Sequence, residues 1–306
     1  MAKTRTAKAM TLRELFEAYR VRKLMGAADA TVRKYDRVIK QAEKLIGRAA
    51  TVDDLTDELV ARMMASKIEK GRSAHTANGD RAKLCALWTW GAKKGYVSTF
   101  PDVDALRAPE TIPTAWTAEQ LPQVFAACDK ATRDMCGVPG ALWFRALLSV
   151  LWDSGERVGA ILDATYSRLN GEWLTIPAAA RKGKTRDKLY RLHPETLSLL
   201  HRMRAYHQRD DVFPHDCCRE QVLNRFRTML KRAGLPYDRK HLFHCIRRSV
   251  ASHAKAAGGD ATAILDHADG AITRKFYIDP RVAPTVAPVD ILFRPSQLPE
   301  GGAIHA

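Results

Sequence analysis

The sequence predicts a mainly α-helical protein of two domains, the second of which contains a small antiparallel β-sheet. Three observations lead to this fold class. Apolar residues recur at helical spacing through most of residues 11–98 and again in long stretches of the second half. Residues 101–114 lose this periodicity and contain three prolines. In the second half, the turn pair Asn170-Gly171 precedes the first of two short strand-like runs.

Four helices are expected in the first domain. Thr11 and Glu14 have the spacing of a capping box, which predicts that the first helix begins there. The second helix is expected to begin near Thr31 and to place apolar side chains on one face. A third, short helix is predicted to start at the capping pair of residues 51 and 54, and a fourth covers about Ser73 to Lys94.

The proline-containing stretch separates this domain from the rest of the chain and reads as a linker. After it, Thr117 and Gln120 form a new capping pair that opens the second domain. We therefore expect a helical domain at residues 1–100, a linker at 101–115, a second domain at 116–285 and a C-terminal tail at 286–306. Within the second domain, helices are predicted at 117–130, at 139–153 and from about 194 onward, and strands at 172–177 and 188–192.

The chain is strongly basic, and its excess positive charge is distributed over both predicted domains. The 306 residues include 50 Lys and Arg against 34 Asp and Glu, a net charge of +16. Residues 1–110 hold 22 basic and 14 acidic residues and so carry +8 of this net charge. Two basic domains on one chain are typical of a clamp around a polyanion such as DNA, although a basic composition also occurs without such a partner.

Several other classes of protein are disfavoured by the sequence. No run approaches the roughly 20 apolar residues that a membrane span needs, and no apolar segment follows the basic N-terminus as in a secretory signal. The group His215, Cys217 and Cys218 has no second ligand pair at zinc-finger distance. We therefore expect a cytoplasmic protein with reduced thiols, no membrane association and no bound metal.

Four short segments of the second domain carry residues suited to chemistry on a phosphate. The first, Ser154-Gly155-Glu156-Arg157, follows an apolar helix, and the second is the basic turn at residues 181–184. The third is His244-Cys245-Ile246-Arg247, whose spacing places its first and last side chains one turn apart on one helical face. The fourth is Leu265-Asp266-His267, which Tyr277 follows ten residues later.

In this order the segments resemble the catalytic domain of the tyrosine recombinase (phage integrase) family. The family's pattern is an Arg in a Thr/Ser-Gly-x-Arg segment, a hairpin Lys, a His-x-x-Arg, a Leu-Gly-His and a nucleophilic Tyr nine or ten residues on. All six positions are filled here, by Arg157, Lys182, His244, Arg247, His267 and Tyr277. Residues 11–98 are similar to the family's helical core-binding domain. The resemblance implies a two-domain clamp on duplex DNA with an α+β catalytic domain.

These residue types also suit one reaction, the attack of a nucleophile on a phosphodiester. A phosphodiester is an anion and resists attack by another anion. Arg157 and Arg247 can offer forked donors to its non-bridging oxygens, and their charge stabilises the five-coordinate transition state. The two histidines, His244 and His267, can add hydrogen bonds to the same oxygens or help to deprotonate the nucleophile.

The same chemistry assigns Tyr277 as the nucleophile. Its hydroxyl would attack phosphorus to form a covalent phosphotyrosine, which in the family is a 3′ linkage, while a general acid protonates the leaving sugar oxygen. Lys182 is the favoured acid and Lys184 a rival; Lys188 is disfavoured because it should lie on the returning strand. The covalent link preserves the energy of the broken phosphodiester, so religation needs neither ATP nor a metal, and no cofactor is expected.

Three positions depart from the family pattern. Gly159 and Ala160 stand where the family usually has Ser-Glu, which questions the docking of that helix more than the chemistry. Asp266 replaces the Gly before the third-motif His. Its carboxylate could repel DNA if it pointed inward, or it could face solvent. Phe276, beside the nucleophile, is expected to be a packing anchor for its helix.

Further DNA contacts are expected on the predicted second helix, where basic residues cluster. Such a run is also what a solvated helix face looks like, so both interpretations stay open. The apolar patch at residues 291–293 could dock on a neighbouring protomer or pack on its own domain. Together with the hairpin Lys184, the candidate DNA-binding residues are Arg33, Lys34, Arg37 and Lys40.

These observations predict a site-specific DNA recombinase that integrates, excises or resolves a mobile element. Its expected partners are double-stranded DNA and further copies of itself, in the family a tetramer, with no small-molecule substrate. Two alternatives remain. A type IB topoisomerase shares the catalytic constellation and would relax supercoils without sequence preference. A catalytically silent DNA-binding protein derived from a recombinase would bind DNA and never form a covalent adduct.

Overall fold

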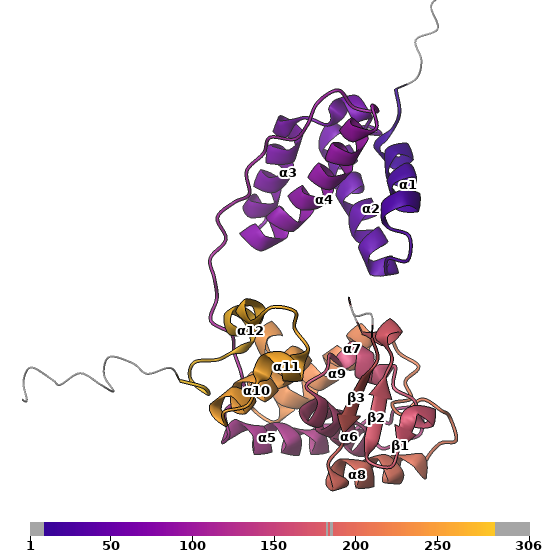
Figure 1. Ribbon diagram of the computed structural model, residues 1–306, viewed down its shortest axis with the longest axis vertical. Helices are drawn as coiled ribbons and strands as arrows, with labels where there is room; N and C mark the ends of the chain where they lie inside the picture. Colours follow the sequence, from indigo (N-terminus) through magenta and orange to yellow (C-terminus); the bar gives the residue numbers. More distant parts are fainter. Residues whose placement is uncertain (1–8, 182, 184–185, 285–306) are drawn as a thin grey trace, which may run out of the picture. The chain divides into compact units, whose positions relative to one another are not determined.

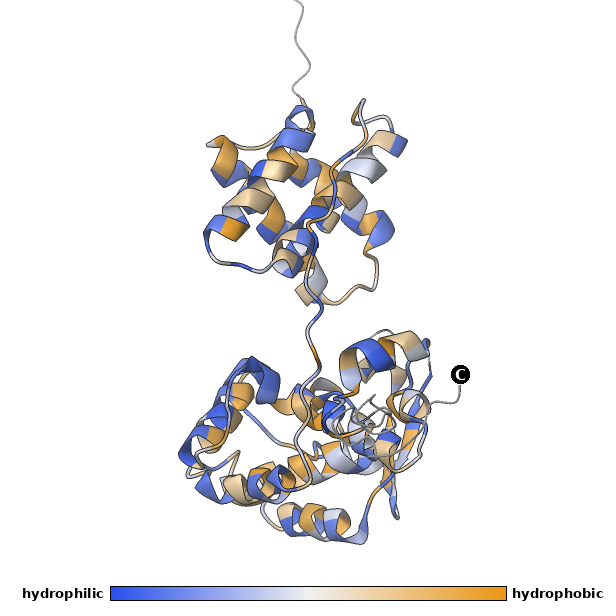
Figure 2. Ribbon diagram, turned by 90° about the vertical axis from the view of Figure 1, so that its left-hand side faces the viewer, coloured by the Kyte–Doolittle hydropathy of each residue, from blue (hydrophilic) through white to orange (hydrophobic). Residues whose placement is uncertain are grey.

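The computed structural model describes residues 9–181, 183 and 186–284, and Figure 1 shows the course of the chain through its helices and strands. Two units meet between Glu110 and Thr111, and each has its own hydrophobic core. Hydrophobic and hydrophilic residues are interspersed along the helices of both units (Figure 2), as expected for amphipathic helices packed on a core. Within the described ranges, no helix is both long enough and apolar enough to cross a membrane.

The first unit is helical. As predicted, Thr11 caps its first helix in a reciprocal capping box with Glu14, and the Ser73 side chain accepts the Thr76 N–H at the start of the last helix. The ring of Tyr35 stacks on the ring of Phe16 in the core, with centroids 5.5 Å apart. The described α-helices of the first unit are α1 (Leu12–Lys23), α2 (Asp29–Ile46), α3 (Asp57–Glu69) and α4 (Ala74–Lys93).

The third helix differs from the prediction. Thr51 and Asp54 do form a capping box, but it encloses only a single 3₁₀ turn, Val52–Asp54. The chain cannot continue as a helix from there because its preceding backbone pairs with the entry to α1: the Val52 N–H donates to the Met10 carbonyl at 2.9 Å. Helix α3 starts afresh after Thr56, whose side chain accepts the Leu59 N–H.

Residues 101–109 have no regular structure, yet their backbone groups are hydrogen bonded to the helices of the first unit. The side-chain amide of Asn78 donates to the Leu106 carbonyl at 2.8 Å and its oxygen accepts the Leu106 N–H at the same distance. Arg81 donates to the Val103 carbonyl. Polar side chains of α4 therefore satisfy the backbone of this aperiodic segment.

The second unit combines helices with a small antiparallel sheet, as predicted. The strands lie in the order β1 (Leu169–Asn170), β2 (Trp173–Ile176) and β3 (Lys188–Arg191). Trp173 pairs with Arg191, and Ile176 pairs with Lys188. The two-residue β1 was not predicted; it pairs with β2 across the Asn170-Gly171 turn. The elements are α5 (Gln120–Ala126), α6 (Gly140–Ser154), α7 (Val158–Leu162), β1 (Leu169–Asn170), β2 (Trp173–Ile176), β3 (Lys188–Arg191), α8 (Pro194–Arg204), α9 (Arg219–Arg232), α10 (Phe243–Ala256), α11 (Ala261–Leu265) and α12 (Gly270–Tyr277).

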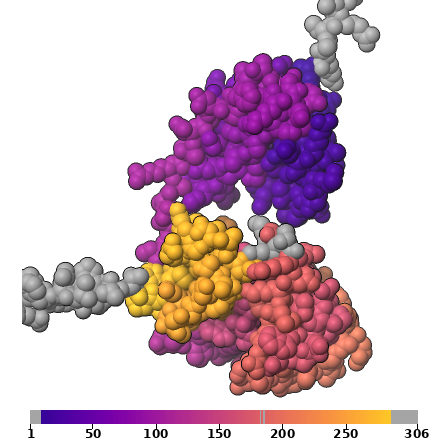
Figure 3. Space-filling view, in the orientation of Figure 1, coloured from indigo at the N-terminus to yellow at the C-terminus, as the bar shows by residue number. Residues whose placement is uncertain are grey.

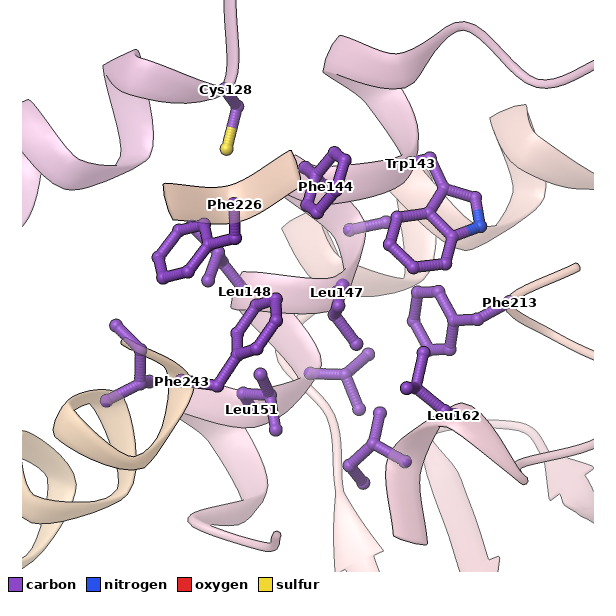
Figure 4. Close-up of a cluster of buried hydrophobic side chains, with 14 of the residues drawn as sticks. Cys128, Trp143, Phe144, Leu147, Leu148, Leu151, Leu162, Phe213, Phe226 and Phe243 are labelled. Carbon is purple, nitrogen blue, oxygen red and sulfur yellow. The ribbon is translucent and has the colours of Figure 1, made fainter. Parts of the chain in front are cut away.

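Helix α6 supplies much of the core of this unit. Its side chains Trp143, Leu147 and Leu151 are buried, and Figure 4 shows them among aromatic side chains from elements distant in sequence. Phe226 of α9 and Phe243 of α10 stack with centroids 4.4 Å apart. This packing fixes the end of α6 and the start of α10, the two places where the first and third sequence motifs begin.

Buried hydrogen bonds join the beginning of the unit to its end. The Ala115 N–H donates to the Asp279 carboxylate at 2.8 Å, and the Trp116 N–H donates to Ser249 Oγ at 2.7 Å. Ser252 Oγ donates to the carbonyl of Tyr277 at 3.1 Å. These bonds connect α10 and the residues around the end of α12 to residues 115 and 116, near the start of the unit.

Candidate active site

The first motif forms a tight turn at the end of α6. Gly155 closes the helix with φ +59°, and a Cβ there would lie 3.1 Å from the Val250 side chain of α10, so glycine is required both for conformation and for space. Arg157 then occupies the N-cap position of α7, with about a third of its side chain exposed (31%). The turn thus presents Arg157 at the surface next to α10.

Glu156, between these residues, is almost fully buried. Its carboxylate accepts the Arg157 N–H at 2.7 Å, Arg181 Nε at 2.8 Å and the Tyr190 hydroxyl at 2.7 Å. Burial by itself would raise the pKa of Glu156, but these hydrogen bonds and the charge of Arg247 outweigh it and hold the pKa below its usual range. A charged carboxylate therefore lies beneath the site, and sequence reasoning missed it.

Helix α10 brings the third motif to the same place. Arg247 is 2% exposed and donates to the carbonyls of Gly155 and of Leu265, the latter at 2.9 Å. Its Nη2 also lies 3.2 Å from Nε2 of His267. Among the residues that the structure describes, Arg247 Nε and Arg157 Nη1 have no hydrogen-bond partner. The two guanidinium groups therefore retain donors for an anion.

His267 follows α11 and is held on both sides. Its Nδ1 lies 2.9 Å from Thr273 Oγ1, and its backbone N–H donates to the Thr262 carbonyl at 3.0 Å. Thr273 is itself buried within α12. The imidazole is thus fixed between Arg247 and the helix that carries Tyr277.

Tyr277 is the last residue of α12, and its ring faces the other motif residues. The centroid of the ring lies 4.5 Å from that of His267, 5.2 Å from that of His244 and 5.5 Å from Cζ of Arg247. The structure thus brings together Arg157, His244, Arg247, His267 and Tyr277. Phe276 does not act as the predicted packing anchor: it is half exposed (50%), because successive residues of α12 point in different directions and Tyr277 takes the inward position.

The surroundings of His244 favour its neutral form. Close packing by protein atoms and then the positive charges of Arg248, Arg247 and Arg157 lower the pKa of His244 to about 4, although part of the ring remains exposed to solvent. At neutral pH the imidazole is therefore uncharged and can accept a hydrogen bond.

This shift predicts a pH dependence of stability. In the unfolded chain a histidine has a pKa of about 6.5, so the unfolded state binds the proton more tightly and the contribution of His244 to folding is lost as pH falls from about 6.5 to about 4. We expect the free energy of unfolding to fall more between about pH 7 and pH 5 in the wild type than in His244→Gln. Urea unfolding at both pH values measures this; equal losses in the two proteins would contradict the lowered pKa.

The hairpin between β2 and β3 approaches this pocket from the side of α11. The predicted acid Lys182 and its rival Lys184 lie outside the described residues. Lys188 lies at the start of β3, as predicted, and its Nζ donates to the Ile264 carbonyl at 2.7 Å. Burial lowers the pKa of Lys188 despite the nearby Asp266 carboxylate. Figure 3 shows the surface of the C-terminal helices (yellow) beside that of the strands (pink) on one face of the second unit.

The sequence model of the phage integrase family matches residues 115–283, which is more than half of the chain and includes every motif residue described above. The chain belongs to the phage integrase family. Comparison with curated proteins gave no match.

Solved structures of integrases and of a recombinase share this fold. A lambda integrase dimer bound to a COC′ core site is 20% identical, with 88% of this chain and 96% of that chain covered and a TM-score of 0.67. The Tn1549 transposon integrase in complex with circular intermediate DNA is 14% identical, with coverage of 92% and 98% and a TM-score of 0.67. The XerH recombinase bound to difH substrate is 18% identical, with coverage of 86% and 80% and a TM-score of 0.63.

Two departures of this phage integrase family member now have physical explanations. A Cβ at Gly159 would lie 2.9 Å from Nη1 of Arg219, whose guanidinium pairs with Asp163, so a larger residue would displace that pair. Asp266 neither points at the pocket nor stands alone in solvent: its carboxylate accepts Arg181 Nη2 at 2.8 Å and Arg186 Nη2 at 3.0 Å. It adopts φ +53°, the left-handed conformation that the family's glycine would take without strain.

The predicted DNA-binding residues Arg33, Lys34, Arg37 and Lys40 are all exposed on α2. Lys40 pairs with Asp36 one turn away, and Arg37 lies 3.4 Å from the buried carboxylate of Asp80. Two further cations near Asp80, Lys67 and Lys83, were not predicted from the sequence. Lys67 pairs with Asp80 at 2.8 Å, and burial together with the charges of Lys34, Arg37 and Lys67 lowers the pKa of Lys83 despite Asp80. Positive charge from α2, α3 and α4 thus converges around one carboxylate.

Proposed function

We propose that this protein is a site-specific DNA recombinase that cleaves and rejoins DNA strands through a covalent 3′-phosphotyrosine intermediate. The observation that supports this most directly is the buried ring of Tyr277 packed against Arg247, His244 and His267, beside guanidinium donors without hydrogen-bond partners in the described chain. A tyrosine among cations and imidazoles suits attack on an anionic phosphodiester better than it suits simple packing.

In this proposal each side chain has one task. Arg157 and Arg247 bind the non-bridging oxygens and stabilise their charge in the transition state. The Tyr277 oxygen forms a bond to phosphorus as the bond to the 5′ oxygen breaks, and Lys182 gives its proton to that leaving oxygen. His244, which is uncharged at neutral pH, or His267 accepts the proton of the tyrosine hydroxyl. Attack of a 5′ hydroxyl on the phosphotyrosine then reverses these steps and rejoins a strand.

The first test of this function is a trapping assay. Nicked duplexes tiled across the flanking sequence of the gene are incubated with the protein and run on a denaturing gel, on which a covalent adduct migrates slowly. Adducts confined to a few duplexes would support a site-specific recombinase and map the cleaved phosphate. Adducts on all duplexes would favour the type IB topoisomerase, and binding without any adduct would favour the silent DNA-binding protein.

The basic face of α2 is proposed to contact DNA phosphates. Each phosphate contact releases a counterion, so removal of one cation lowers the slope of log K against log[salt] by about 1. We expect Arg33→Ala and Lys34→Ala each to reduce the slope by about this amount, without loss of stability since both side chains are exposed. Fluorescence anisotropy across a salt series measures the slope.

Arg48→Ala is the matched control for these variants. Arg48 is also exposed and basic, but it lies beyond the end of α2 and is engaged by Asp54 at 2.6 Å. Its removal should leave the slope unchanged. An equal change in all three variants would show that only net charge matters and would remove the case for an α2 contact.

We further propose that the active form is a homo-oligomer on DNA. Lambda integrase is found as a dimer bound to a core site in one structure and as a tetramer bound to a Holliday junction in another. Assembly of this chain into a tetramer on two recombination sites would give one nucleophile for each strand that is exchanged. Sedimentation with and without cleavable duplex tests this assembly.

A further inference from the structure

The base of the hairpin that joins β2 and β3 is fastened to the turn after α11 from both of its sides. On the β2 side, Arg181 Nη2 donates to Asp266 Oδ2 at 2.8 Å. On the β3 side, Lys188 Nζ donates to the carbonyls of Ala263 and Ile264, at 3.3 and 2.7 Å. The next residue along this turn is His267, so the hairpin is anchored to the segment that positions a pocket residue.

Arg181 is the most constrained of these anchors. Its side chain is 1% exposed, and each end of its guanidinium has an acceptor: Nε donates to Glu156 at 2.8 Å, Nη2 to Asp266 at 2.8 Å and Nη1 to the Arg186 carbonyl at 3.2 Å. A planar group held at three positions has little freedom to rotate or shift. The backbone at residue 181 is therefore fixed in both position and direction.

The partners of Arg181 are parts of the pocket. Glu156 also accepts the N–H of Arg157, and its carboxylate lies 3.6 Å from Nη1 of Arg247. Asp266 directly precedes His267. A single buried arginine thus joins the hairpin directly to the first and fourth motif segments, and through Glu156 to the third.

Stability alone does not account for this arrangement. A buried ion pair is often no more stabilising than a well-packed apolar group of similar volume, because both charges must be removed from water. Asp266 in addition adopts a left-handed conformation, which aspartate tolerates less readily than glycine does. Such a group is better explained by the geometry that it imposes than by the energy that it contributes.

We propose that Arg181 is a positioning residue, which with Glu156 and Asp266 holds the hairpin so that its lysine donor meets the leaving 5′ oxygen. This inference rests on the proposed function. It assigns to Arg181 no contact with the DNA: the residue acts through the lysine that the hairpin carries, and its loss should impair proton donation rather than phosphate binding or nucleophilic attack.

A sulfur leaving group separates these possibilities. Two nicked duplexes are compared, one with the normal 5′ oxygen at the scissile phosphate and one with sulfur in its place. A thiol has a pKa of about 8.5, so the sulfur leaves as a thiolate without a donated proton. Arg181→Met should slow adduct formation on the oxygen duplex by about 100-fold, the usual contribution of a general acid, and leave the rate on the sulfur duplex within about threefold of wild type. Lys182→Ala should give the same pattern.

Two further variants complete the test. Asp266→Asn keeps a side chain that tolerates the left-handed conformation, but it removes the carboxylate charge that pairs with Arg181. Adduct formation on the oxygen duplex should therefore slow by only about tenfold, and the sulfur duplex should restore the rate. Arg191→Met removes an exposed arginine of the same hairpin, paired only with Glu172 among the described residues, and should behave as wild type.

The outcomes are distinct. If the wild type forms no adduct on either duplex, the proposed function fails and this inference fails with it. If the wild type forms adducts but Arg181→Met loses both substrates equally, or neither, the positioning role is wrong while the recombinase function stands. Thermal unfolding of each variant accompanies the rates, and Asp266→Asn decides the matter if Arg181→Met does not fold.

Discussion

Replacing Tyr277 by phenylalanine should abolish the covalent adduct on nicked duplexes while leaving the fold and DNA binding intact. The substitution removes only the hydroxyl. The ring contacts with His244, His267 and Arg247 do not depend on the hydroxyl and should persist, and the Tyr277 carbonyl still accepts the Ser252 bond. Without an oxygen to attack phosphorus no phosphotyrosine can form, so the signal should drop below detection rather than fall by a small factor. Denaturing gels and a binding titration on the same duplex measure the two properties.

Tyr206→Phe is the matched control for this variant. Tyr206 is about half exposed (52%) and lies just beyond α8, outside the motif segments. The control should form adducts at the wild-type rate. Persistence of the adduct in Tyr277→Phe would show that another residue is the nucleophile, and loss of DNA binding together with the adduct would show that the hydroxyl has a structural role.

The sequence predicted those features that depend on local patterns. The capping pair Thr11–Glu14 marks the true start of α1, and the Asn170-Gly171 turn lies between paired strands. Caps and turns are readable because their determinants lie within four residues of one another. The capping pair of residues 51 and 54 led to the wrong prediction of a helix because the cause lies outside the local sequence. Backbone pairing with the distant residues 10–12 stops a helix that local signals would allow.

The motif residues could be predicted because the family pattern fixes their order, but their supporting shell could not. Glu156 lies 25 residues before its partner Arg181 and 34 residues before its partner Tyr190, so no local spacing reveals that the two charges meet in the interior. A buried charged pair leaves no periodic signal in the sequence. The same holds for Asp266, whose partners Arg181 and Arg186 lie 85 and 80 residues earlier.

Arg247→Lys should reduce both catalysis and stability, although charge is conserved. Lysine cannot reproduce the fork that reaches the carbonyls of Gly155 and Leu265 and approaches Glu156, nor leave a donor over for phosphate. A buried carbonyl left without its donor costs about 1–3 kcal/mol of folding stability, and loss of one transition-state donor slows the reaction by about 10²–10³-fold. Single-turnover adduct formation and urea unfolding measure the two effects.

Arg157→Lys separates these two consequences. Arg157 is about a third exposed, and its side chain approaches Glu156 only at 3.8 Å, so its replacement should leave folding stability nearly unchanged. Its proposed contact with phosphate is nonetheless as direct as that of Arg247, so adduct formation should fall by a similar factor of about 10²–10³. If both variants lost activity only in proportion to lost stability, the arginines would be structural residues. A loss of activity without a loss of stability in Arg157→Lys would mean instead that the reaction depends on the forked geometry of the guanidinium at the phosphate.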